Sequence, residues 1–405
     1  MVTMLRSVFF ILPLLLVQTL SGQPKQDTYV VVVSMDGFRW DYLEKTSLPH
    51  LKRIGESGVK ADAIIPCFPS KTFPNHYSMA TGLHPAQHGI VMNSFYDSDL
   101  ELSYRISNRK AVMDPVFYEG EPIWVTAEKQ GLTSASFYWV GSEAPVKGIQ
   151  PTYWKPYQHD FPYAQRIDTV IAWLNLPESQ RPRLIMLYFD EPDGVGHAFG
   201  PNAPETFAVL RQMDSLIGQL YARLQVLPIF DKINLIVTSD HGMGPISPDR
   251  AVVLSEILDP AWIIRAEGGN PSYNLQVREG FMDSVMSRIK AQPHLQAWKT
   301  NEAPERLHYR DQVRLLDLCV AADSAWSVHW QRKDSYAGAG THGYDNANSD
   351  MHAIFYATGP AFKRGIRVPA FANVNLYLLI SRLLGLDPAQ TEGKLEVILP
   401  MLNEE

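Results

Sequence analysis

The stretch Tyr29–Gly37, YVVVVSMDG, places four consecutive valines before a short polar segment that contains an aspartate. A near-continuous apolar run of this length, without alternation, favours a strand buried on both faces of a parallel sheet. Three further runs share the pattern of an aliphatic stretch that ends at polar residues: LIMLYFDEPDG from Leu184, INLIVTSDHG from Ile233 and HAIFYATGP from His352. Together they predict a sheet of buried, parallel strands.

Helix-like segments separate these runs. PHLKRIGESGV starts at Pro49, and ETFAVLRQMDSLIGQLYARLQ, from Glu205, repeats its apolar residues at three- and four-residue steps. A further segment, FANVNLYLLISRLLGLDP, is expected to close the chain as a helix that stops before Pro388. Strands that alternate with helices predict an α/β fold, with a central, mostly parallel sheet and helices on both faces.

The polar residues that follow the predicted strands define a candidate site. Asp36, Asp193 and Asp240 each come just past the end of a strand. Ligands of open α/β sheets bind outside the carboxyl ends of the strands. The three aspartates are therefore expected at one edge of the sheet.

The composition describes a folded chain of moderate size. Of its 405 residues, 45% are hydrophobic and 20% are charged, and the formal net charge is −7. These proportions are typical of a globular protein with a sizeable core. The chain has no basic run, which argues against binding of a nucleic-acid duplex.

The first 22 residues have the order of a secretory signal: one arginine, an apolar run from Val8 to Val17, then small and polar residues. We expect this segment to be removed, and we expect residues 23–405 to form one domain. The region around 245–336, rich in proline, tryptophan and mixed charges, is expected to be an insertion or peripheral. No later run is long enough to span a bilayer. The mature protein is therefore expected to be exported without a membrane anchor, to the periplasm or the extracellular space.

Three more segments interleave aspartate, histidine and glycine. DEPDGVGHAFGP carries Asp193 and His197, and its glycines predict a loop that folds both side chains onto one ion; SDHGM carries Asp240 and His241; and GTHGYDN carries His342. Together with Asp36 they supply three carboxylates and three imidazoles, enough for two ions, and this mixture suits zinc. Each residue alone is also explained as a turn former, a helix cap or a hydrogen-bonded structural residue. His76, His84, His88 and His352 lack this setting and are interpreted as structural.

CFPSKTFPNHY, from Cys67 to Tyr77, offers two candidate nucleophiles. The Thr72 hydroxyl needs activation to act as a nucleophile, and a zinc ion can provide it. Thr72 also lies at the start of an expected helix, so its alternative role is that of an N-cap. Cys67 fits the C-x-P-x-R core of sulfatases except that Lys71 stands in place of the arginine. Its alternatives are a packed thiol or a disulfide with Cys319, the second of the two cysteines.

Five ordered segments resemble the nucleotide pyrophosphatase/phosphodiesterase (NPP) family of the alkaline phosphatase superfamily: MDGFRWDY, FPSKTFPNHYSMATGLHPAQHGIVMNSFYD, DEPDGVGHAFGP, SDHGM and GTHGYDN. The resemblance implies an alkaline-phosphatase-like fold and a nucleophile at Thr72 that forms a covalent phosphoryl-threonine intermediate. It implies one zinc ion held by Asp36, Thr72, Asp240 and His241, and a second held by Asp193, His197 and His342. It also implies that Asn93 donates a hydrogen bond to a phosphoryl oxygen.

The resemblance implies a phosphodiester substrate. In nucleotide-cleaving members the base stacks between two aromatic rings, which here indicates Phe73 and either Tyr153 or Trp154 in QPTYWKPY. Such an enzyme would release nucleoside 5′-monophosphates from nucleotide diesters, dinucleotides or triphosphates. Other members cleave choline-containing phosphodiesters. Aromatic and acidic residues can bind the choline cation, so this alternative stays open.

Overall fold

The computed structural model describes residues 27–332 and 338–403. The expected signal segment, residues 1–22, lies outside the described residues. Within the described part, no helix combines the length and the apolar character needed to cross a bilayer.

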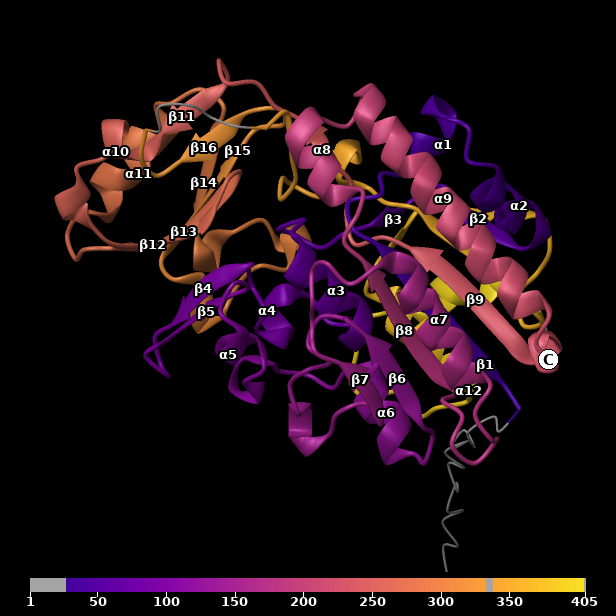
Figure 1. The fold of residues 1–405 in the computed structure, drawn as a ribbon. Helices are drawn as coiled ribbons and strands as arrows, with labels where there is room; N and C mark the ends of the chain where they lie inside the picture. Colours follow the sequence, from indigo (N-terminus) through magenta and orange to yellow (C-terminus); the bar gives the residue numbers. More distant parts are fainter. Residues whose placement is uncertain (1–26, 333–337, 404–405) are drawn as a thin grey trace, which may run out of the picture.

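A central eight-stranded sheet carries the strands that the sequence predicts (Figure 1). Its parallel pairs are β1 with β8 and β9, β6 with β8 and β7, and β2 with β19. The prediction of a mostly parallel sheet is confirmed. In order across the sheet, the strands are β19 (Ile366–Val368), β2 (Val59–Ala61), β18 (Phe355–Thr358), β9 (Ile233–Thr238), β1 (Tyr29–Met35), β8 (Leu184–Phe189), β6 (Ser134–Phe137) and β7 (Tyr153–Lys155).

One predicted parallel strand has the opposite direction. β18, within HAIFYATGP, pairs antiparallel with both β9 and β2. Its first residue, Phe355, lies opposite Thr238, the last residue of β9. The chain therefore enters β18 at the carboxyl edge of the parallel strands, after the loop that carries His342, and must run back across the sheet.

The four valines of β1 have their side chains on alternate faces and are fully buried. Val30 and Val32 pack in the core that contains α3 (Thr72–Thr81), α6 (Ile123–Lys129) and α12 (Asn375–Leu384). Val31 and Val33 pack in the core that contains α2 (Pro49–Ser57), α7 (Tyr163–Leu174) and α9 (Pro204–Gln225). Helices thus cover both faces, and the predicted helices at Pro49, Glu205 and the C-terminal segment are confirmed.

A second sheet lies beside the first, at the upper left of Figure 1. It is antiparallel, has its own core, and falls within the region that the sequence indicates as peripheral. Its strands, in order, are β12 (Ile263–Gly269), β13 (Ser272–Val277), β15 (Leu318–Ala322) and β14 (Leu295–Lys299), accompanied by α10 (Leu254–Ile257) and α11 (Met282–Lys290).

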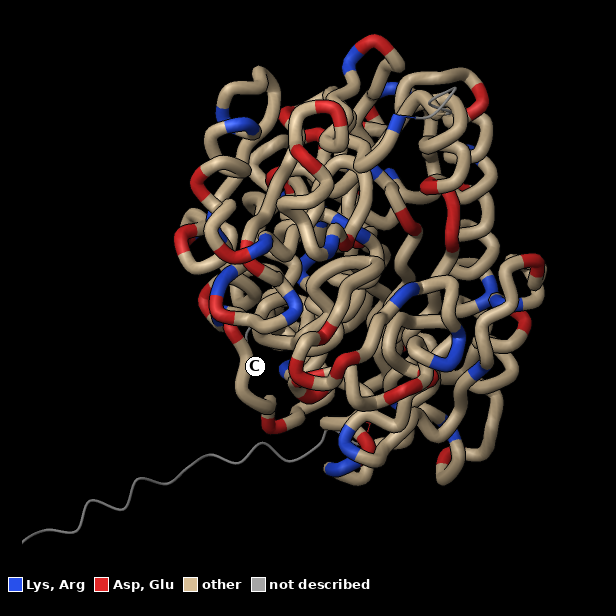
Figure 2. The backbone as a smooth tube through the Cα atoms, turned by 90° about the vertical axis from the view of Figure 1, so that its left-hand side faces the viewer, with Lys and Arg blue, Asp and Glu red and all other residues tan. Residues whose placement is uncertain are grey.

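Short elements complete the described fold. The helices are α1 (Tyr42–Lys45), α4 (Pro85–His88), α5 (Arg109–Val112), α8 (Asp193–Phe199) and α13 (Leu395–Ile398). Four strand pairs are β4 (Ser94–Asp97) with β5 (Leu102–Arg105), β3 (Ile64–Ile65) with β20 (Phe371–Ala372), β10 (Gly244–Pro245) with β17 (Gly340–Thr341), and β11 (Ala251–Val253) with β16 (Ser327–His329). Acidic and basic residues are scattered over the backbone and form no single basic stripe in the view of Figure 2.

Candidate active site

The carboxyl ends of β1, β8 and β9 bring the candidate ligands together. These three strands are parallel neighbours, so the residues that follow them meet at one edge. Two groups form there, along the division that the sequence resemblance implies. We call Asp36, Asp240 and His241 the buried trio, and Asp193, His197 and His342 the rim trio.

Short distances join the members of each trio. In the buried trio, His241 Nε2 lies 3.4 Å from Asp36 Oδ1 and 3.0 Å from Asp240 Oδ2. In the rim trio, Asp193 Oδ1 lies 3.5 Å from Nε2 of both His197 and His342. The rings of His241 and His342 stack at 3.6 Å between their centroids, so the two trios are adjacent.

The three imidazoles are oriented as metal ligands usually are. Their Nδ1 atoms lie 2.8–2.9 Å from the backbone carbonyls of Gly242, Gly340 and Ser70, for His241, His197 and His342 respectively. A carbonyl only accepts, so each Nδ1 carries the hydrogen and each Nε2 faces the site.

The protonation of two of these rings follows from their surroundings. Burial, followed by the neighbouring His241, lowers the pKa of His342 well below its usual value, so this ring is neutral. Burial lowers the pKa of His241, but the Asp240 carboxylate, Asp193 and the Gly242 carbonyl together raise it above its usual value. A metal ion would therefore compete with a proton at His241 Nε2.

The carboxylates lack the partners that burial demands. Asp36 Oδ1, Asp240 Oδ2 and Asp193 Oδ1 are buried and accept no hydrogen bond. Burial, together with the charges of Asp240 and Asp193, raises the pKa of Asp36 well above its usual value. Carboxylate oxygens without a hydrogen bond, beside three imidazole nitrogens, fit divalent cations, and this mixture of nitrogen and oxygen donors suits zinc.

The segment that carries Asp193 and His197 is a helix, α8, and not the loop that its glycines predict. One helical turn separates the two residues, so both side chains lie on one face. The glycines serve close packing instead: a Cβ on Gly196 would lie 3.0 Å from the Met243 side chain. Gly37 has φ +71°, and a Cβ there would lie 3.0 Å from Asp193 Cα, so this glycine lets β1 end against α8.

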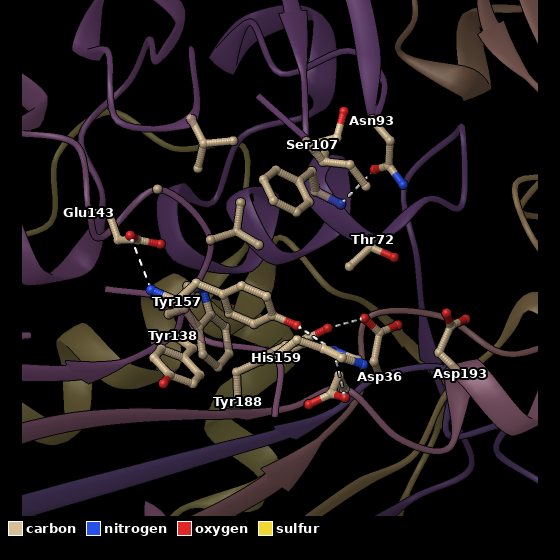
Figure 3. Close-up of a pocket in the computed structure, with 18 of the residues that line it drawn as sticks. Asp36, Thr72, Asn93, Ser107, Tyr138, Glu143, Tyr157, His159, Tyr188 and Asp193 are labelled. Atoms are coloured by element: carbon tan, nitrogen blue, oxygen red, sulfur yellow. Dashed lines mark hydrogen bonds and ion pairs between the residues drawn. The ribbon is translucent and has the colours of Figure 1, made fainter. Parts of the chain in front are cut away.

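Thr72 is the first residue of α3, and Lys71 occupies the N-cap position. The alternative interpretation of Thr72 as an N-cap is therefore wrong. Its Oγ1 lies 3.2 Å from His241 Nε2, beside the buried trio. Asn93 accepts a 3.0 Å hydrogen bond from the Phe73 N–H through Oδ1, which fixes the amide and leaves its Nδ2 as a donor near Thr72 (Figure 3).

Two residues that sequence reasoning did not assign to the site support its ligands. His76 Nδ1 donates to the Thr72 carbonyl at 3.0 Å and lies 3.3 Å from Asp240 Oδ2. The Tyr188 hydroxyl donates to Asp36 Oδ2 at 2.6 Å. Both are buried, and their contacts hold α3 and β8 against the buried trio.

A cavity of about 610 Å³ opens from this edge (Figure 3). The candidate residues Asp36, Thr72, Phe73 and Asn93 line it together with all three members of the rim trio. Its further aromatic walls are Tyr138, Trp139, Tyr157 and Tyr188. At its far end, Glu143 accepts from the Tyr157 N–H at 3.2 Å and pairs with Arg109.

The structure does not bring Tyr153 or Trp154 to this cavity. Both belong to β7, an edge strand, where the Tyr153 ring stacks on Trp173 and its hydroxyl donates to the Gln180 carbonyl. Tyr157 comes after the carboxyl end of β7 and lines the cavity instead. The strand-end rule that selects the aspartates would also have selected Tyr157 within QPTYWKPY.

Cys67 is buried and does not line the cavity. Its thiol donates to Asn373 Oδ1 at 3.1 Å, and burial raises its pKa to about 12. Cys319 is also buried, and both thiols are free, so the two cysteines form no disulfide. Among the alternatives that the sequence leaves open for Cys67, the structure supports the packed thiol.

Known proteins match this chain closely. The family profile described as type I phosphodiesterase / nucleotide pyrophosphatase matches residues 30–345. Two solved structures of ectonucleotide pyrophosphatase/phosphodiesterase 5 cover 93% of this chain and 100% of their own chains, each with a TM-score of 0.89. One is the murine protein, 35% identical, in an inactive Thr-to-Ala variant in complex with AMP; the other is the human protein, 34% identical.

Curated relatives give the same result over part of their length. A venom phosphodiesterase of Crotalus durissus collilineatus and human ectonucleotide pyrophosphatase/phosphodiesterase family member 1 are each 36% identical over 90% of this chain. The chain spans less than half of each, 45% and 40% respectively. The profile match and these identities lead to one conclusion: the chain belongs to the type I phosphodiesterase / nucleotide pyrophosphatase family.

Proposed function

We propose that this protein is a zinc-dependent nucleotide pyrophosphatase/phosphodiesterase that cleaves phosphodiester or pyrophosphate bonds and releases nucleoside 5′-monophosphates. The observation that carries the proposal is the Thr72 hydroxyl, 3.2 Å from His241 Nε2 and beside three buried carboxylate oxygens that accept no hydrogen bond. The buried trio with Thr72 would hold one zinc ion, and the rim trio the second. When bound, the two ions would lower the pKa of the Thr72 hydroxyl and neutralise charge on the phosphoryl group and the departing oxygen.

The chain's own residues would divide the remaining work. Thr72 Oγ1 forms a bond to phosphorus while the bond to the leaving oxygen breaks, and the proton lost by Thr72 balances the one gained by the leaving group. Water then cleaves the phosphoryl-threonine ester and restores the hydroxyl. Asn93 Nδ2 donates to a non-bridging oxygen, and the N-terminus of α3, ten residues long, favours the anion.

The charge of this donor supports a diester substrate. Asn93 is neutral, and the arginine on the cavity wall, Arg109, is paired with Glu143. A phosphomonoester carries more negative charge than a diester and would gain more from an unpaired arginine.

The walls of the cavity support a nucleotide. Its volume of about 610 Å³ is within the usual range of small-molecule sites. Phe73, next to the nucleophile, and Tyr157 line the cavity and would receive the base by stacking, which tolerates different bases. The murine relative solved with AMP supports the same ligand class for this chain.

The direct test compares two variants on four substrates: a chromogenic nucleotide diester, a phosphomonoester, a sulfate ester and a phosphocholine ester. We expect the diester to be the best substrate, Thr72→Ala to abolish its turnover, and Cys67→Ala to retain most of it. Zinc chelation should stop turnover, and zinc should restore it. The proposal would be contradicted if activity on the monoester equalled or exceeded that on the diester, or if Cys67→Ala alone lost activity. Preference for the phosphocholine ester would assign a choline-phosphate substrate instead.

We also propose that the protein is exported, to the periplasm or the extracellular space. The sequence pattern of residues 1–22 supports this, and so does the similarity to venom enzymes. Expression of the full sequence, followed by N-terminal sequencing of the protein outside the cell membrane, tests it. Cleavage near residue 22 is expected, whereas retention of the uncleaved chain in the cytosol would contradict export.

A further inference from the structure

A third group of metal-ligand residues lies away from the cavity. His84 immediately precedes α4, His308 ends a short helical turn (Glu305–Leu307) beside the second sheet, and Glu392 lies beyond α12. Each offers a nitrogen or carboxylate oxygen within 4.8 Å of the other two. We call these three residues the outer trio. They share no residue with the active-site cavity or with either trio described above.

The carboxylate of the outer trio is fixed in place. Glu392 Oε2 accepts from the His84 backbone N–H at 2.7 Å and from His84 Nδ1 at 2.8 Å. The Glu392 N–H in turn donates to the Gly82 carbonyl at 2.8 Å. The second oxygen, Oε1, faces His308 Nδ1 at 3.9 Å, a gap too long for a hydrogen bond. Both imidazoles thus present Nδ1 to one carboxylate.

The two rings are held together in an unusual way. Their centroids are 3.9 Å apart and their planes differ by 9°. His308 has φ +48° and ψ +41°, the left-handed region that few residues other than glycine occupy. Strain of this kind tends to persist at functional sites. Two protonated rings would repel at this distance, so the stack requires that one ring be neutral.

The neutral ring is His308. Burial and the neighbouring His84 lower its pKa, so one of its ring nitrogens has a lone pair at neutral pH. His84 Nδ1 donates a hydrogen bond to Glu392 Oε2. Two imidazoles and one carboxylate are donors that a transition-metal site uses.

We propose that His84, His308 and Glu392 form a third metal site, which binds Zn²⁺ or a similar divalent transition ion. Two imidazole nitrogens and one carboxylate oxygen are a known zinc ligand set, with a fourth position for water. The ion would displace the proton between His84 and Glu392 and release it to solvent. Tetrahedral ligands stand roughly 3.3–3.6 Å apart at zinc–ligand distances of about 2.0–2.2 Å, so binding should draw the three atoms inward and tilt the rings.

Such an ion would join three segments that are distant in the sequence: the end of the nucleophile helix α3, the peripheral region and the segment after α12. Its expected effect is on stability rather than on turnover, because the outer trio does not touch the cavity. Sequence analysis interpreted His84 as structural, and only the fold reveals its pairing with His308.

The chain contains a matched control for His308. His294 also has a positive φ, +68°, stacks on an aromatic ring (Trp326) at 3.9 Å and lies 3.5 Å from a carboxylate (Asp323). The His294 side chain is 41% exposed and that of His308 is 47% exposed. The difference is that His294 has no second imidazole within the group.

The test is a count of zinc equivalents. Metal-stripped full chain is titrated with ZnCl₂ against a chromogenic chelator, for wild type, His308→Asn and His294→Asn. Asparagine tolerates the left-handed backbone, so both variants should fold. We expect His308→Asn to bind one equivalent fewer than wild type, at unchanged turnover, and His294→Asn to match wild type. Glu392→Gln, which keeps an acceptor for the His84 N–H, should weaken the same equivalent by more than ~10-fold.

The readout is a difference, so it does not depend on how many ions the active site holds. Equal stoichiometry in wild type and His308→Asn would overturn the third site and leave the proposed function intact. Equal loss in both histidine variants would overturn it as well, since a general surface effect would then explain the result. The number of zinc equivalents lost in His308→Asn is measured independently of turnover, so the Thr72→Ala result tests the proposed function and not the third metal site.

Discussion

The buried trio and the rim trio use the same two residue types in different proportions and settings. Two carboxylates and one imidazole form the buried trio, and their side chains are 0–3% exposed. One carboxylate and two imidazoles form the rim trio, in which His197 is 41% exposed. The buried ligands follow the central strands β1 and β9, whereas the rim ligands lie on α8 and after β17.

This difference has consequences for how each trio would hold its ion. More negative charge and less water should make the ion of the buried trio tighter and slower to exchange. The rim trio is open to solvent, so water can replace a missing ligand there. Three perturbations test the contrast, from the largest expected effect to the smallest.

Removing a carboxylate from the buried trio should have the largest effect. Asp240→Asn takes away a charge that no water can replace, so we expect kcat/KM to fall by more than ~10³-fold, comparable to the loss of a major electrostatic contact in other active sites. Excess zinc should not restore activity. The measurement is kcat/KM on a nucleotide diester across zinc concentrations. Asp231→Asn, at an exposed aspartate, is the control and should keep wild-type activity. If added zinc restores the activity of Asp240→Asn, the proposed difference between the two trios is wrong.

Removing a ligand from the rim trio should cost less. His197→Ala leaves Asp193 and His342 in place and admits water, so we expect a loss of about 10–100-fold at low zinc. Millimolar zinc should restore much of it, because the remaining ligands still bind the ion weakly. The same titration of kcat/KM measures this. If zinc restores neither variant, then exposure does not distinguish the trios.

The smallest effect concerns the stability of metal-stripped protein. The pKa of Asp36 in the folded chain is raised, chiefly by burial. The stability that its protonated form contributes is complete below the unfolded pKa and is lost as pH rises through the raised folded value. Asp36→Asn avoids this loss, so in chelator its Tm should exceed that of wild type at neutral pH.

The two Tm values should converge at acidic pH, and each 1 kcal/mol corresponds to about 2–4 °C in a sizeable domain. Added zinc should reverse the order, because wild type then gains the ion. Thermal unfolding across pH, with and without zinc, measures both effects. If the Tm of Asp36→Asn in chelator is below that of wild type at every pH, then the buried charge of Asp36 does not destabilise the metal-stripped protein.

The sequence predicted those parts of the fold and site that depend on local pattern. Four unbroken aliphatic runs predicted the central strands, and the strand-end rule placed Asp36, Asp193 and Asp240 at one edge. The sequence also predicted that a helix starts at Thr72, and α3 begins there. These inferences hold over a few residues, where burial and periodicity determine the backbone.

The missed features depend on contacts between distant segments. The direction of β18 is set by where the preceding loop ends, and the helical state of α8 by the packing of Gly196 on Met243. Tyr157 was missed because β7 ends two residues before it, and strand ends are the least certain part of a sequence-based assignment. The role of His76 arises from a contact with Asp240, 164 positions along the chain.

The spread of the rim trio along the chain affects how the protein is made. Asp36 leaves the ribosome roughly 300 residues before His342, and at about 5–20 residues per second this interval lasts about 15–60 s. During that time the buried trio can gather all its members, but the rim trio has only Asp193 and His197. A nascent or prematurely ended chain could therefore take up one ion and not the second. Truncation before His342 would therefore leave the buried trio complete and the rim trio without its third member.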